Sequence, residues 1–318
     1  MAGIRKVALA ALAAVSLSVH AQPYPAKPVK IVVATGAGTV DDVGARVVAD
    51  KLSQLLGQPF YIENRPGAGG SIGQGFVMKS PPDGYTLLLA GGSMAGARYA
   101  NANVEYDLLR DFTPISQLAT FPFALVANSA LPVKDVKELI ALAKAQPGKL
   151  SYGTIGAGQI PYWSVTLFNS MAGIKVLEVP YKATPDVLTD VVAGRIDYYI
   201  TGLSSVLPLK DKLKILAVTT LTRVEQLPDV PTISEAALPG YEMPAWHSIM
   251  GPARLPPEIV ATLNAGIVKS LNSPEVRERY LKAGLTPKPS SPEELRKTYE
   301  HWIGVFGKIA KDVGLKPQ

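Results

Sequence analysis

The sequence contains no cysteine among its 318 residues. This absence excludes disulfide bonds, catalysis by a thiol and metal sites with cysteine ligands. Histidine is also scarce, because only His20, His247 and His301 occur, and no two of them have HxH or HxxxH spacing. We therefore expect neither a metal site rich in histidine nor a bound cofactor.

The sequence also lacks an apolar run long enough to span a membrane. The apolar stretch at residues 7–19 is shorter than the roughly 18–20 residues that a spanning helix needs. It follows Arg5 and Lys6 and ends in the small-x-small pattern Val19-His20-Ala21. A membrane anchor is the alternative, but this order is typical of a secretory signal peptide at residues 1–21, cleaved after Ala21. The sequence thus predicts an exported protein.

Charge is limited and dispersed along the chain. The 32 Lys and Arg against 26 Asp and Glu give a net charge of +6, and no basic block of five or more occurs. A dispersed, mildly basic composition does not indicate a nucleic-acid partner. It is compatible with a small anionic ligand.

What the chain does contain is an alternation of strand-like and helix-like patterns. Short apolar runs occur, for example, at residues 30–35, 60–64 and 150–154, and helical patterns follow them from 43, 72 and 161. Near the end, Ser291 and Glu294 form the pattern of a capping box. Alternating βα units predict an α/β fold with mostly parallel sheets, in which ligands bind at the carboxyl ends of strands.

Two glycine loops each lie between a strand-like run and the helical pattern that follows it. Gly36-x-Gly38 follows the first apolar run, and Gly156-x-Gly158 follows the strand at 150–154. Such loops let the N–H groups and the positive dipole of a helix start approach an anion. Neither loop has the third glycine of a dinucleotide fingerprint or the Lys-Ser/Thr of a phosphate loop. They are therefore either anion-binding devices or tight turns that only reverse the chain.

Two neighbouring acids follow the first glycine loop. Asp41 is interpreted as favourable charge in the first turn of a helix. The alternative role, a contact with an amine or hydroxyl of the ligand, stays open for Asp42.

Several segments together resemble a known family. They include residues 63–70 (ENRPGAGG), 82–88 (PDGYTLL) and 179–182 (VPYK). The chain resembles the periplasmic solute-binding receptors of tripartite tricarboxylate transporters, the Bug family, over nearly all of its expected mature length.

The resemblance implies a two-domain periplasmic binding protein fold, type II-like, with a ligand cleft between the domains. The first domain would comprise residues 22–122 plus 245–318, and the second residues 123–244. It further implies a non-catalytic, monomeric receptor that captures a small organic carboxylate and delivers it to membrane permease subunits.

Ligand-binding positions are also implied by the resemblance, matched residue by residue. They are Gly36, Ala37, Gly38, Thr39, Asp42, Gly92, Ser93, Met94, Thr154, Gly156, Ala157, Gly158, Gln159, Tyr162, Thr184, Thr201, Ser204 and Trp246.

Three of these positions depart from the family pattern. The first loop lacks the usual proline-phenylalanine start, Tyr162 stands near where many members have a histidine, and Thr201 stands where many have an acid. Tyr162 and Trp163 could form an aromatic wall for a ring-bearing acid, or one of them could belong to the core. Thr201 disfavours an amino acid as the ligand.

Two other functions remain open from the sequence. Gly91-Gly92-Ser93-Met94-Ala95 nearly matches the nucleophile elbow of a serine ester hydrolase, with His247 downstream and Asp186 or Asp197 between them. A receptor of this kind could also act as a ligand sensor for a membrane signalling kinase.

Overall fold

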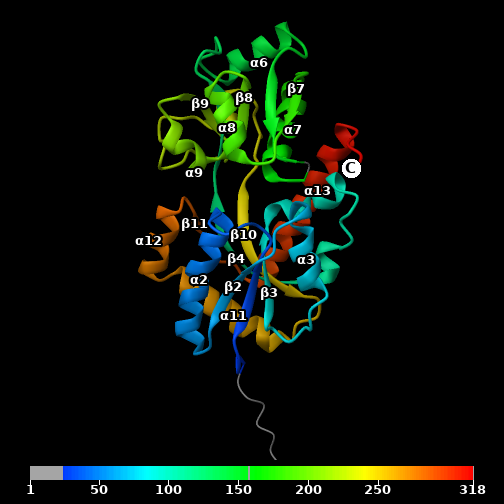
Figure 1. The fold of residues 1–318 in the computed structure, drawn as a ribbon, viewed down its shortest axis with the longest axis vertical. Helices are drawn as coiled ribbons and strands as arrows, with labels where there is room; N and C mark the ends of the chain where they lie inside the picture. The colour runs from blue at the N-terminus through cyan, green and yellow to red at the C-terminus, as the bar shows by residue number, and fades with distance from the viewer. Residues whose placement is uncertain (1–23, 157, 318) are drawn as a thin grey trace, which may run out of the picture.

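The computed structural model describes residues 24–156 and 158–317. The expected signal peptide, its cleavage site and Ala157 lie outside the described residues. Two sheets, one above the other in Figure 1, organise these residues. We call each sheet with its covering helices a lobe.

The first lobe contains a six-stranded sheet in the order β11-β4-β10-β3-β1-β2. Its strands are β1 (Val29–Val33), β2 (Phe60–Asn64), β3 (Thr86–Gly91), β4 (Phe112–Phe121), β10 (Ala245–Pro252) and β11 (Thr286–Pro287). Its helices are α2 (Val40–Leu56), η2 (Ala68–Gly70), α3 (Ser71–Met78), η3 (Gly92–Ala95), α4 (Ala97–Ala100), α5 (Leu108–Asp111), α11 (Pro257–Leu271), α12 (Pro274–Lys282) and α13 (Pro292–Asp312).

The second lobe contains a five-stranded sheet in the order β7-β6-β8-β5-β9. Its strands are β5 (Phe123–Asn128), β6 (Ser151–Thr154), β7 (Leu177–Pro180), β8 (Tyr198–Gly202) and β9 (Leu213–Val218). Its helices are α6 (Val136–Ala145), α7 (Ile160–Ala172), α8 (Thr184–Val192), α9 (Leu203–Val206), η4 (Leu207–Leu209) and α10 (Ile233–Ala236).

The chain passes between the lobes along extended segments. β4 leads through Pro122 directly into β5, and β10 returns from the second lobe into the first sheet. β10 runs antiparallel to β3 and β4, and β5 runs antiparallel to β8 and β9. The expectation of mostly parallel sheets therefore needs correction: both sheets are mixed, because β10 in the first sheet and β5 in the second run against the βα units.

Local sequence signals explain where the helices begin and end. Ser291 and Glu294 form the predicted capping box at the start of α13. Gly57 ends α2 in the left-handed conformation, at φ 71°, which glycine adopts without steric cost. Val48 and Leu52 of α2 are buried against the first sheet, so its apolar face holds the helix in place.

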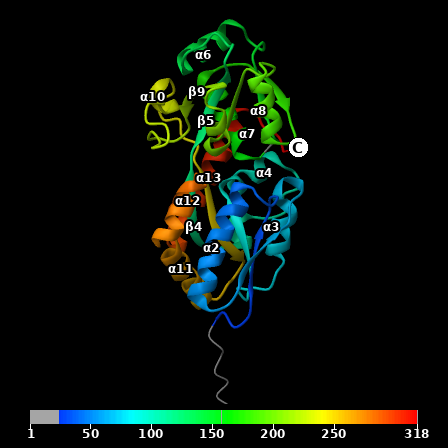
Figure 2. The ribbon, with the colours of Figure 1, turned by 60° about the vertical axis from the view of Figure 1, so that its left-hand side comes forward.

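Helix α13 joins the lobes in a third place. It begins on the first lobe, and its far end reaches the second (Figures 1 and 2). There Phe306 packs on Trp163 of α7, with ring centroids 4.9 Å apart. One hydrophobic cluster accordingly includes residues of both sheets. The lobes thus share an apolar contact in addition to the two crossing segments.

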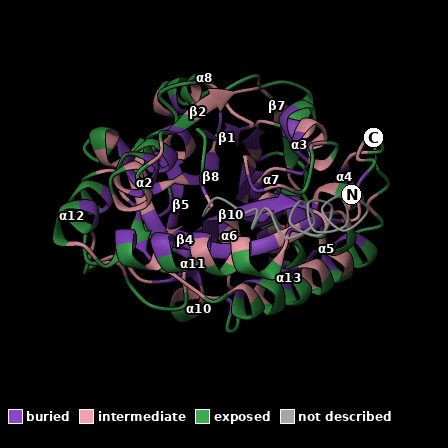
Figure 3. Cartoon of the chain, turned by 90° about the horizontal axis from the view of Figure 1, so that it is seen from below, coloured by how far each residue is buried: buried purple, intermediate pink, exposed green. Residues whose placement is uncertain are grey.

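The core lies along the strands, with helices outside. Figure 3 shows buried strands inside a layer of helices whose outward faces are exposed. Within residues 24–156 and 158–317, no helix combines the length and the apolar character needed to cross a membrane.

Candidate functional site

A cavity of about 210 Å³ lies between the lobes, at the level of the crossing strands. It is lined by Val40, Asp41, Gly91, Gly92, Ser93, Phe121, Phe123, Ile155, Gln159, Ile160, Pro161, Thr184, Thr201, Gly202, Ser204, Ser205, Ala245, Trp246 and His247. This volume is below the roughly 300–1,000 Å³ of pockets for drug-sized ligands. It suits a small organic molecule that contacts both lobes.

Larger hollows occur elsewhere on the molecule. One of about 440 Å³ is lined by first-lobe residues between Arg65 and Tyr106, and one of about 570 Å³ lies between α8 and the segment from Ser205 to Lys212. Each of these is confined to a single lobe, and a third, also of about 570 Å³, lies between α7 and the segment from Val313 to Pro317 without any residue of the crossing strands in its lining. The cavity between the lobes is smaller, but it combines polar groups from both, and we take it as the candidate site.

The second lobe presents two helix starts to this cavity. Ile160 and Pro161 open α7, and Thr184 opens α8. Neither helix has a side chain that caps its first N–H groups. Because those N–H groups have no acceptor within the helix, they offer positive charge and hydrogen bonds to an anion.

Hydroxyl groups supplement the helix starts. Thr201, at the end of β8, is buried and lines the cavity, and the Thr184 hydroxyl lies 3.4 Å from the hydroxyl of Tyr199. None of the described residues that line the cavity is Lys or Arg. The second lobe can therefore bind an anion through dipoles and hydroxyls, without a formal positive charge.

The first lobe presents an acid–base pair instead. Oδ1 of Asp41 lies 2.7 Å from Nε2 of His247, and the Thr35 hydroxyl donates to Oδ2 of Asp41 at 3.2 Å. Burial alone would raise the pKa of Asp41, but the charge of His247 and the hydrogen bonds from His247 and Thr35 outweigh it and lower that pKa. An ionised carboxylate only accepts hydrogen bonds, so Nε2 of His247 carries the hydrogen.

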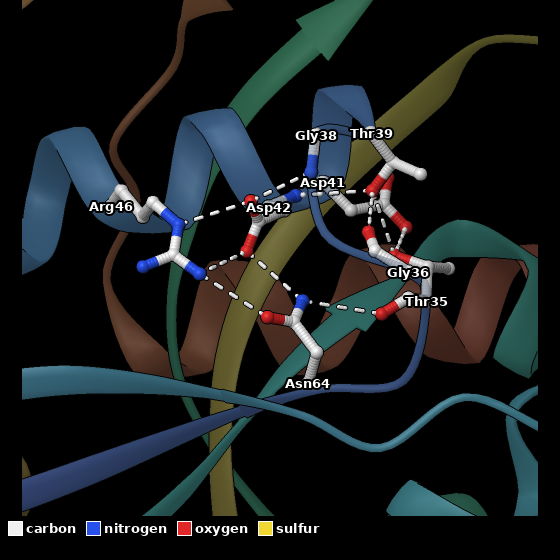
Figure 4. Close-up of polar contacts among 8 residues, drawn as sticks. All are labelled: Thr35, Gly36, Gly38, Thr39, Asp41, Asp42, Arg46 and Asn64. Carbon is white, nitrogen blue, oxygen red and sulfur yellow. Dashed lines mark hydrogen bonds and ion pairs between the residues drawn. The ribbon is translucent and has the colours of Figure 1, made fainter.

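Asp42, by contrast, is turned into the protein. Its carboxylate accepts hydrogen bonds from the Gly38 N–H (2.9 Å), from Asn64 Nδ2 (2.9 Å) and from Arg46 Nε (3.0 Å), as Figure 4 shows. Arg46 lowers the pKa of Asp42 to about 2, with help from Gly38 and Asn64 and against the opposing effect of burial.

The placement of the two acids is therefore the reverse of the expected one. Asp42 is structural and does not line the cavity, whereas Asp41, interpreted from sequence as first-turn charge, does. A signal for Asp42 was present in the sequence, because Arg46 stands four residues later, at the spacing of a helical ion pair. Nothing comparable links Asp41 to His247, which lies 206 residues away.

The structure brings seven of the expected ligand-binding residues to the cavity. They are Gly92, Ser93, Gln159, Thr184, Thr201, Ser204 and Trp246. Gly92 is required there, because a Cβ at this position would lie 2.6 Å from the ring of Trp246. Phe121 and Phe123 at the crossing also line the cavity, although neither was among the expected ligand-binding residues.

Other expected residues lie near the cavity without lining it. Gly36, Ala37, Gly38 and Thr39 form the exposed first loop, in which Thr39 caps α2 by accepting the N–H of Asp42. Thr154 and Gly156 belong to the second loop, and the Thr154 hydroxyl lies 3.4 Å from the Gly156 N–H. Met94 and Gly158 line a small neighbouring hollow between the lobes.

Tyr162 is placed away from the cavity. It lines a different hollow, between α7 and the segment from Val313 to Pro317. Its neighbour Trp163 is fully buried against Phe306. The expected aromatic wall is therefore corrected: neither ring lines the cavity, because α7 points these two side chains toward α13 and the chain end.

The lobes touch each other at two places around the cavity. Gln159 Nε2 donates to the carbonyl of Gly69 at 3.4 Å, and a Cβ at Gly158 would lie 3.6 Å from Cβ of Ala100. At a second place, a Cβ at Gly284 would lie 3.3 Å from Cβ of Ser204. The two lobes are therefore in contact around the cavity.

The geometry does not assemble the hydrolase triad considered above. Asp197 accepts hydrogen bonds from Ser151, and Asp186 is exposed, so neither orients His247. His247 instead pairs with Asp41 through Nε2, and Nδ1 lies toward Gly44 of α2, where a built Cβ would be 3.8 Å away. Ser93 lines the cavity with its hydroxyl as a polar group.

A comparison with known proteins identifies the family of this chain. A model of the tripartite tricarboxylate transporter family receptor matches residues 44–315. The chain belongs to this family. A "UPF0065 protein in tcbD-tcbE intergenic region" from Pseudomonas sp. (strain P51) is 36% identical over 92% of this chain and 88% of that protein.

Solved structures agree with the family assignment. The R. palustris protein Rpa4515 with adipate has a TM-score of 0.83 at 34% identity and covers 93% of this chain and 100% of that chain. MatC from Rhodopseudomonas palustris with bound malate has a TM-score of 0.79 at 31% identity, over 90% of this chain and 100% of that chain. The two-lobed α/β fold is thus that of the family's periplasmic binding proteins.

Proposed function

We propose that this protein is an exported receptor that binds a small organic carboxylate between its lobes and delivers it to a membrane permease. The observation that carries the proposal is the cavity shared by both lobes, with the uncapped starts of α7 and α8 on one wall. The adipate and malate in the two similar structures support the class of ligand.

We further propose a division into two domains, residues 22–122 with 245–318 and residues 123–244, that close around the ligand. The assignment of strands to the two sheets supports this division, and the contacts at Gln159 and Ser204 would form on closure. A ligand that touches both domains stabilises only the closed form, which gives the permease a signal to recognise. The protein would act in the periplasm as a monomer without catalysing a reaction.

A thermal-shift and calorimetric screen of the chain from Gln22 onward tests the function. Linear dicarboxylates of increasing length are compared with diols of the same length, which lack charge. We expect a carboxylate to raise the free energy of unfolding by about 2.7 kcal/mol at a hundredfold excess over its Kd. Equal binding of the diols, or no binding by any carboxylate, would contradict the proposal.

A matched pair of variants locates the site. Thr201→Val removes a cavity hydroxyl without changing the size of the side chain, and should weaken binding by about 0.5–1.5 kcal/mol. Thr189→Val is the control, because the hydroxyl of Thr189 is exposed and donates to the carbonyl of Pro185 in its own helix. Equal affinities of the two variants would place the ligand elsewhere.

A further inference from the structure

Asp41 retains unused acceptor capacity in the cavity. Its side chain is 34% exposed, whereas that of its partner His247 is 3% exposed. Two donors reach the carboxylate, the Thr35 hydroxyl on Oδ2 and Nε2 of His247 on Oδ1. Since an ionised carboxylate has about four lone-pair sites, it can accept further hydrogen bonds from whatever fills the cavity.

The carboxylate is also held in one direction. The ring of His247 packs on Phe121 with centroids 4.6 Å apart, and its Nε2–H holds Oδ1 of Asp41 at 2.7 Å. His247 is thus a positioning residue: it fixes where the negative charge lies and leaves the other face of the carboxylate toward the cavity.

The two walls of the cavity therefore have opposite electrical character. The starts of α7 and α8 on the second lobe favour an anion, whereas a second carboxylate next to Asp41 on the first lobe would be repelled. A dicarboxylate without a hydrogen-bond donor would place either a second negative charge or no donor group next to Asp41. A group that donates a hydrogen bond would be attracted to it.

We propose that the ligand carries a hydrogen-bond donor, a hydroxyl or an ammonium group, in addition to its carboxylate, and that Asp41 accepts this hydrogen bond while the second lobe binds the carboxylate. The inference rests on the proposed receptor function and specifies its ligand class. It also reverses the expectation that Thr201 disfavours an amino acid as the ligand. Asp41, on the opposite wall of the cavity, can accept a hydrogen bond from an ammonium group.

Calorimetry with matched acids tests this on the protein from Gln22 onward. Succinate is compared with malate and aspartate, and adipate with 2-hydroxyadipate and 2-aminoadipate, so that each series differs only in the donor. We expect the hydroxy or amino acid of a series to bind about tenfold or more tightly than its parent, as a hydrogen bond to a charged group provides. Whichever of the hydroxy acid and the amino acid binds more tightly identifies the donor as a hydroxyl or an ammonium group.

Asp41→Asn is the deciding variant. The amide keeps the size of the side chain and an acceptor for His247, but it removes the negative charge. We expect the preference for the substituted acid to fall by about tenfold or more, with the affinity for the parent acid unchanged or increased. Asp50→Asn, on the exposed side of the same helix, should preserve the wild-type ratio.

The outcomes separate the inference from the function on which it rests. If the parent acids bind as tightly as the substituted ones, or if Asp41→Asn leaves the ratio unchanged while lowering the melting temperature, Asp41 is structural and the inference is wrong. If none of the acids binds, the receptor function itself is wrong and the inference fails with it.

Discussion

The two glycine loops share the letters GAG and a place between a strand and a helix, yet the structure uses them in opposite ways. The first loop satisfies its own polar groups: Gly38 donates to Asp42, and Thr39 caps α2. The second loop leads into α7, which has no side-chain cap, and it touches the other lobe through Gln159. The difference teaches that a glycine loop can offer N–H groups to an anion only where nearby side chains leave its helix start open.

The largest effect should come from breaking the closed network of the first loop. Asp42→Ala removes the common acceptor of Gly38, Arg46 and Asn64, and should lower the free energy of unfolding by about 3 kcal/mol. Denaturant titration measures this change. Asp50→Ala is the control, because its ion pair with Arg279 is exposed and contributes about 0–1 kcal/mol. Similar losses in both variants would show that the network adds nothing.

A smaller effect should distinguish the glycines of the two loops. Gly156 has φ 115°, which a residue with a side chain rarely adopts, so Gly156→Ala should cost about 1–2 kcal/mol of stability. At Gly36 a Cβ would meet nothing within 4 Å and the backbone needs no glycine, so Gly36→Ala should stay within about 0.5 kcal/mol. Paired thermal melts of the two variants check the difference. A costly Gly36→Ala would mean that the first loop is more constrained than its geometry indicates.

The last prediction concerns the pH dependence of stability, which should be measurable only in acid. The folded-state pKa of Asp42 is lowered to about 2, below the roughly 3.9 of an unfolded aspartate. Its contribution to stability is therefore complete above about pH 5 and is lost as the pH falls from about 4 toward 2. Denaturation curves of wild type and Asp42→Asn should converge in this window. A constant difference down to pH 2 would exclude a linked ionisation of Asp42.

The sequence predicted individual strands and helices better than it predicted how the strands pair into sheets. The expected βα units and the capping box at Ser291 appear in the structure. The strands β4, β5 and β10, which cross between the lobes, were not expected as strands. β5 and β10 run against the βα units and β4 runs with them, and pairing between such distant segments leaves no local periodicity to read.

The sequence by itself determined the alternation of strands and helices and the capping box of α13, because each depends on residues within a few positions of one another. Tertiary structure alone decided which of two adjacent acids faces the cavity. Neighbouring residues point about 100° apart around a helix, so one of the pair meets Asn64 on β2 and the other His247 on β10. Those partners come from distant parts of the chain, and only the packed fold places them.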